Sequence, residues 1–98
     1  MARNISLGAV VDPQAELGED VMVGPFCVIG PNVRIGSGTR IANNVAVLGH
    51  TTIGEDNILF PNVVIGAEPQ DLSYSGAPTR VEIGHRNQFR EGVTVNRA

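Results

Sequence analysis

Two histidines, one cysteine and one segment that interrupts the regular pattern of the chain hold the side chains best suited to chemistry. A histidine can act as a general base near neutral pH, and His50 and His85 are both predicted at turns that face outward. A solvated or backbone-bonded turn histidine is the simpler interpretation of each. A zinc site needs three protein ligands, which two histidines separated by 35 positions do not supply. We therefore expect no metal and no cofactor, and interpret Cys27 as a small packed apolar residue.

The composition places these side chains in one small acidic domain, residues 1–98. The formal net charge of −3 argues against a nucleic-acid partner, because nucleic-acid binding needs a basic face. No apolar run approaches the roughly 18 residues that cross a bilayer, and the first residues show no signal peptide. A single cysteine forms no internal disulfide, which fits a reducing compartment. We expect a soluble, cytoplasmic protein.

The element that must position these side chains is a six-residue repeat. Every sixth residue from Ile5 is apolar over eleven repeats, and the series resumes in phase after a gap of 18 residues. Composition alone predicts roughly four aliphatic residues at these positions, so the period is real. The series is Ile5, Val11, Leu17, Val23, Ile29, Ile35, Ile41, Val47, Ile53, Leu59 and Ile65, then Ile83, Phe89 and Val95.

The spacing inside each repeat predicts short strands joined by sharp turns. A mostly small or β-branched residue stands four positions after each aliphatic residue, and the next aliphatic residue follows two positions later. Inward residues are therefore spaced by four and two in turn, whereas the apolar face of an α-helix needs spacings of three and four. Glycine and asparagine at Gly38, Asn43, Asn44 and Gly49 suit a sharply bent backbone. Three such faces make an 18-residue coil, and stacked coils make an all-β parallel β-helix of triangular section with about five coils. A β-sandwich is improbable, because its loops would break the phase.

One segment, residues 67–78, is predicted to be extruded from the β-helix as a loop, and the repeat resumes near Thr79. It carries the only tyrosine, two prolines and the acid Asp71. Loops on a rigid scaffold often carry function, although a passive bulge is the alternative interpretation.

This segment and the residues after it resemble a known family. The run of residues 70–84, followed by Asn87, Arg90-Glu91 and residues 93–97, is similar to the UDP-N-acetylglucosamine acyltransferases of lipid A biosynthesis. These enzymes are bacterial hexapeptide-repeat transferases. The resemblance covers essentially the whole chain, and it implies a left-handed β-helix assembled as a homotrimer.

The resemblance also implies an activity. Members of this family transfer a hydroxyacyl chain from acyl carrier protein to the 3-hydroxyl of UDP-N-acetylglucosamine, with a histidine as general base and no covalent acyl-enzyme. Asp71 falls on the acid that contacts the sugar, and Gln70, Ser73 and Asn96 are the other expected substrate contacts. Ser73 stands where the family often has lysine, so we expect one cationic contact to the nucleotide sugar to be missing. Asn96 stands where some members have histidine, and its amide keeps hydrogen bonding but does not titrate near neutrality.

The same resemblance places the catalytic histidine, the acyl-chain groove and the C-terminal helices after the position of Ala98. We therefore expect no catalytic residue in this chain and no acyl transfer by the chain alone. Its expected contribution is the scaffold and the sugar-contacting loop. The alternative function is a non-catalytic short β-helix that acts as an assembly or capping module.

Overall fold

The computed structural model describes residues 4–67 and 80–96, and these form short strands joined by turns, with no helix. The strands are β1 (Asn4–Ile5), β2 (Val10–Val11), β3 (Glu16–Leu17), β4 (Met22–Val23), β5 (Val28–Ile29), β6 (Val33–Ile35), β7 (Arg40–Ile41), β8 (Ala46–Val47), β9 (His50–Ile53), β10 (Ile58–Leu59), β11 (Val64–Ala67), β12 (Arg80–Ile83), β13 (Gln88–Phe89) and β14 (Thr94–Asn96). None of these residues belongs to a helix that is long and apolar enough to cross a membrane.

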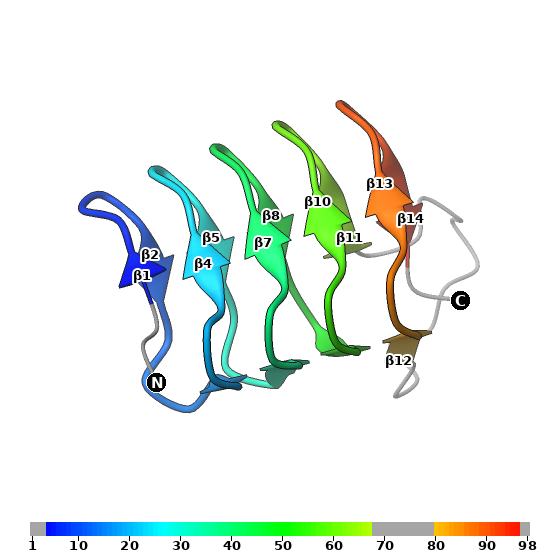
Figure 1. Ribbon diagram of the computed structural model, residues 1–98, viewed down its shortest axis with the longest axis horizontal. Helices are drawn as coiled ribbons and strands as arrows, with labels where there is room; N and C mark the ends of the chain where they lie inside the picture. The colour runs from blue at the N-terminus through cyan, green and yellow to red at the C-terminus, as the bar shows by residue number, and fades with distance from the viewer. Residues whose placement is uncertain (1–3, 68–79, 97–98) are drawn as a thin grey trace.

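Three parallel sheets form the sides of a coiled prism (Figure 1). The first sheet has the strand order β1-β4-β7-β10-β13, the second β14-β11-β8-β5-β2, and the third β12-β9-β6-β3. Paired residues lie 18 positions apart, as Val23 does opposite Ile41. Across residues 68–79 the offset becomes 30, since Leu59 pairs with Phe89. The predicted parallel β-helix is therefore confirmed, and the repeat resumes in register after the interruption.

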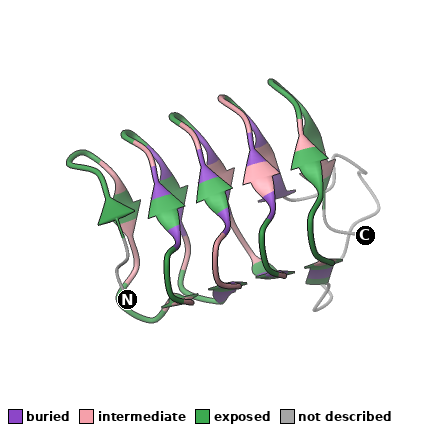
Figure 2. Ribbon diagram, viewed as in Figure 1, coloured by how far each residue is buried: buried purple, intermediate pink, exposed green. Residues whose placement is uncertain are grey.

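The core is a column of aliphatic layers along the axis of the prism (Figure 2). Most of the short strands bury the aliphatic residue of their hexad and leave the residue before it exposed or half-buried, because side chains alternate between the two faces of a strand. The prediction of an inward residue was wrong for Ile5, which is 44% exposed because β1 lies at the end of the column. The layers at the two ends of the column are more open. The buried hexad residues are Val23, Ile29, Ile35, Ile41, Val47, Ile53, Leu59 and Ile65, and those partly buried are Val11, Leu17, Ile83, Phe89 and Val95.

One inward column is polar and joins three coils. Asn57 is fully buried, and its side-chain amide donates to the Gly84 carbonyl at 2.8 Å and accepts from the Asn87 N–H at 2.8 Å. Its own backbone N–H donates to the Thr39 hydroxyl at 3.3 Å, and that hydroxyl donates to the Gly54 carbonyl at 2.9 Å. Because each partner is satisfied, this buried polar group avoids the desolvation penalty and fixes the corner after the third sheet.

The corners of the prism are made by residues with positive φ. The predicted bends at Gly38, Asn44 and Gly49 are confirmed, with φ of 77°, 60° and 66°. Asn43 lies in the same turn as Asn44 but has no positive φ. Phe26 also has a φ of 61°, although its side chain is bulky and 66% exposed. Left-handed backbone costs about 1–2 kcal/mol for such a residue. Phe26 adopts it because the coil must turn at this corner to close.

The backbone at the end of β11 is held by close packing around Gly66. This glycine has a φ of +85°, and a Cβ on it would collide with the Leu48 carbonyl oxygen and meet the Thr51 hydroxyl at 2.6 Å. That hydroxyl in turn donates to the Leu48 carbonyl at 2.7 Å. Ala67, the first residue of the predicted loop 67–78, is the last residue of β11, and residues 68–79 lie outside the described residues.

We expect Ile29→Ala to destabilise the protein by about 2–5 kcal/mol, because it empties part of a closed aliphatic layer. Met22→Ala on β4 is the control. Its side chain faces outward on the first sheet, so its effect should stay within about 0.5 kcal/mol. Urea unfolding followed by circular dichroism measures both, and equal losses would contradict the inward and outward assignment.

We expect Gly66→Ala to cost more than about 3 kcal/mol, because positive φ and a backbone collision act together. Gly92 separates the two effects, since its φ is +76° and a Cβ added to it would meet nothing within 4 Å. Gly92→Ala should cost only about 1–2 kcal/mol. If the two variants unfold at the same urea concentration, the packing around Gly66 is not the constraint described above.

Candidate functional site

The structure describes one of the four predicted substrate contacts, Asn96. Gln70, Asp71 and Ser73 lie outside the described residues. Asn96 is the last residue of β14, is exposed, and pairs with Ala67 at a register shift that follows Ile65. The pairing of β14 with β11 therefore places Asn96 beside the point where the chain enters residues 68–79, three positions before Gln70.

The chain returns to the β-helix at β12, beside β9. Arg80 pairs with His50, and Val81 pairs with Thr51 and is buried against the core. Four consecutive residues of the two strands keep this register, and the pair is one of the longest in the fold. Both ends of the segment 68–79 are thus anchored to strands whose positions the core determines.

The two histidines have different environments. His85 follows β12 in a bend, and its Nδ1 accepts a hydrogen bond from the Glu55 N–H at 2.7 Å. The interpretation of His85 as a backbone-bonded turn histidine is confirmed. His50 is exposed, but the turn prediction was wrong for it, because it is the first residue of β9. Neither histidine forms an ion pair with a carboxylate among the described residues, so neither has the orienting partner typical of a general base.

Cys27 is buried in the core, as expected for a packed small residue. Its Sγ lies 2.9 Å from the Ala42 carbonyl oxygen, to which it donates. Burial raises the pKa of this thiol, so the reactive thiolate is disfavoured. Among residues 4–67 and 80–96, no group of three or more His, Cys, Asp or Glu side chains is arranged to hold a metal ion.

Arg90 and Glu91, which belong to the sequence motif described above, contact each other and a neighbouring ring. The Arg90 guanidinium lies 4.4 Å from the centre of the Phe60 ring, and its Nε lies 3.2 Å from Glu91 Oε1. A hydrogen bond from its own backbone N–H lowers the pKa of Glu91, and Arg90 lowers it further. These contacts link the last two coils at an exposed corner.

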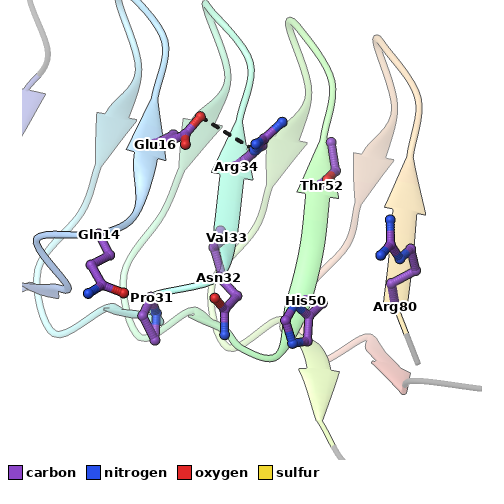
Figure 3. Close-up of a pocket in the computed structure, with 9 residues that line it drawn as sticks. All are labelled: Gln14, Glu16, Pro31, Asn32, Val33, Arg34, His50, Thr52 and Arg80. Atoms are coloured by element: carbon purple, nitrogen blue, oxygen red, sulfur yellow. Dashed lines mark ion pairs between the residues drawn. The ribbon is translucent and has the colours of Figure 1, made fainter. Parts of the chain in front are cut away.

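A polar groove runs along the outer face of the third sheet (Figure 3). It has a volume of about 390 Å³ and is lined by residues from β3, β6, β9 and β12 and from the turns before β3 and β6. The groove was not predicted from the sequence, because its side chains are scattered over 67 positions of the chain. Outward residues spaced 18 apart, such as Glu16, Arg34 and Thr52, are the signal that indicates it. The lining residues are Gln14, Glu16, Pro31, Asn32, Val33, Arg34, His50, Thr52 and Arg80.

Known proteins match this fold and sequence. Residues 14–49 match the model of the bacterial transferase hexapeptide family (six repeats). The chain is 58% identical over 90 residues to the acyl-[acyl-carrier-protein]–UDP-N-acetylglucosamine O-acyltransferase of Akkermansia muciniphila, and 49% identical over 90 residues to that of Thermodesulfovibrio yellowstonii. Each match covers 92% of this chain and 35% of the relative.

A solved structure agrees with both matches. The UDP-N-acetylglucosamine acyltransferase from Bacteroides fragilis superposes with a TM-score of 0.92 at 45% identity, over 96% of this chain and 37% of that one. This likeness confirms the predicted left-handed parallel β-helix. The chain spans about a third of the length of the relatives it matches. It therefore carries bacterial transferase hexapeptide repeats and is homologous, over nearly all of its length, to about a third of the UDP-N-acetylglucosamine O-acyltransferases.

Proposed function

We propose that the chain forms part of an O-acyltransferase that moves a hydroxyacyl chain from acyl carrier protein to the 3-hydroxyl of UDP-N-acetylglucosamine, the first step of lipid A biosynthesis. The observation that carries this proposal is the identity of 49% and 58% to two such enzymes over 90 residues. The superposition at a TM-score of 0.92 supports it, because the scaffold is retained together with the sequence.

The role of the chain in this reaction is to hold the acceptor sugar. Asp71 accepts hydrogen bonds from sugar hydroxyls, because a carboxylate is a strong acceptor for them. Gln70, Ser73 and Asn96 supply further polar contacts. The pairing of Asn96 with Ala67 supports this assignment, since it brings Asn96 to the start of the segment that carries the other three residues. The packing at Gly66 supports it as well, because it holds that starting point rigidly.

We also propose that the enzyme acts as a homotrimer in the cytoplasm. Exposed Val10 and Val28 follow one another on the outer face of the second sheet and supply apolar surface for assembly. The single cysteine is buried as a free thiol, which fits a reducing compartment.

The general base of the reaction is proposed to come from outside these 98 residues. Nδ1 of His85 is occupied by the Glu55 N–H, and His50 has no orienting carboxylate among the described residues. The 98-residue chain, incubated with a hydroxyacyl carrier protein and UDP-N-acetylglucosamine, should therefore give no turnover above the uncatalysed rate. Formation of acylated nucleotide sugar in proportion to the amount of chain would overturn this part of the proposal.

A chimera tests the acceptor-binding role directly. The matching 90 residues of the Akkermansia muciniphila relative are replaced by those of this chain, and acyl transfer is measured by the release of carrier-protein thiol. We expect the chimera to be active. Asp71→Asn in it should lower kcat/KM about 10- to 100-fold, the effect of losing a hydrogen bond to a charged acceptor.

Asp56→Asn is the matched control for this chimera. Asp56 is exposed at a corner turn between the third and first sheets, and asparagine tolerates its φ of 58°. This variant removes the same charge and should leave kcat/KM unchanged. An inactive but folded chimera would favour the alternative role of an assembly or capping module, and equal losses in the two variants would contradict the role of Asp71.

A further inference from the structure

The groove on the third sheet has a floor and two walls. His50 and Thr52 form the floor, because they lie two positions apart on β9 and both point outward. Arg34 on β6 pairs with Thr52, and Arg80 on β12 pairs with His50. The two arginines stand on opposite sides of β9 (Figure 3). They are two strand spacings of about 4.8 Å and two residue steps of about 3.3 Å apart, so their Cα atoms lie about 12 Å from each other along a diagonal.

The positive charge in the groove is only partly neutralised. Glu16 lies on β3, on the side of Arg34 away from β9, and its Oε1 is 3.4 Å from Arg34 Nε. Both side chains are about two-thirds exposed, so this ion pair is weak. The pair engages Nε of the guanidinium, which leaves its two terminal nitrogens as donors. Arg80 forms no ion pair with any carboxylate in the part of the chain that the structure describes.

One more acid lies on the same face and limits the charge of the groove. Glu82 is the outward residue of β12 after Arg80 and pairs with Thr52, but it does not line the groove. The residues that line the groove carry a formal charge of +1, from Arg34 and Arg80 against Glu16, although the whole protein has a formal charge of −3. Glu82 offsets this charge at the border of the groove, beside Arg80.

We propose that this groove is a binding site for a phosphate or diphosphate group, held between Arg34 and Arg80 over His50 and Thr52. Planar guanidinium groups donate paired hydrogen bonds to phosphate oxygens, and the imidazole N–H and the hydroxyl donate from below. One guanidinium satisfies a carboxylate, whereas two on opposite sides of a strand suit an anion with oxygens on several sides. The volume of about 390 Å³ is that of a small-ligand site. This inference does not rest on the proposed acyltransferase function.

Calorimetric titration of the 98-residue chain with inorganic phosphate, pyrophosphate, UDP and UDP-N-acetylglucosamine tests the site. We expect saturable binding of pyrophosphate, tighter than that of phosphate. Arg80→Gln should weaken pyrophosphate binding about tenfold, the effect of losing a charged hydrogen-bond donor. Glu16→Gln should strengthen it, because it removes the carboxylate that competes for Arg34.

Arg40→Gln is the matched control, because Arg40 is an exposed outward residue of β7 on the first sheet and makes the same change in net charge. It should leave pyrophosphate affinity unchanged. Equal weakening by Arg40→Gln and Arg80→Gln, or no saturable binding of either anion, would overturn the proposal. If UDP and UDP-N-acetylglucosamine bind more tightly than pyrophosphate and are equally sensitive to Arg80→Gln, the groove takes a nucleotide diphosphate. If they bind no more tightly, it takes the free anion.

Discussion

The backbone ladder between successive coils is the interaction on which the rest of the structure depends. A backbone N–H in one coil donates to a carbonyl in the next at an offset that is constant except across residues 68–79, as Gly24 does to Ile41 at 2.8 Å. Because the offset is constant, the place of a residue within its hexad decides whether it points inward or outward. Inward columns exclude water and stabilise the fold, whereas outward columns bring side chains from distant parts of the chain into one row. The Asn57 network and the arginine groove are an inward and an outward result of the same constraint.

Most of the fold could be predicted from the sequence, because the six-residue period of the side chains matches the 18-residue offset at which the backbone of one coil pairs with the next. The hexad series predicts which residues of the strands point inward. It also predicts the burial of the polar Asn57, which stands at the second inward position of its hexad, where small residues are usual. Local preferences predict less well. Phe26 adopts a backbone suited to Gly or Asn because the coil must close there, and His50 begins a strand because β12 pairs with β9 as far as that residue. The hand of the β-helix followed from the resemblance to a family and not from the repeat.

The candidate site could be predicted only in part. Asp71, Gln70, Ser73 and Asn96 were indicated by similarity to a family, because no period or spacing marks them. The position of Asn96 beside Ala67 depends on the offset of 30 between β11 and β14 and on a register shift after Ile65, without which Asn96 would lie opposite Gly66. The groove on the third sheet depends on an offset of 30 between His50 and Arg80, which only the pairing of β9 with β12 establishes. Where the regular spacing breaks, three-dimensional information is needed to see which side chains meet.

The constant offset between paired residues also has a consequence for how the protein folds as it is synthesised. Each coil needs only the one made before it as a template, so a coil can add to the growing prism once about 18 further residues have left the ribosome. Residues 68–79 are the exception, because β12 must wait for twelve extra residues before it can pair with β9. The folding of the chain during translation should therefore proceed in even steps with one pause. That pause falls between the coils that hold the ends of the segment bearing Asp71.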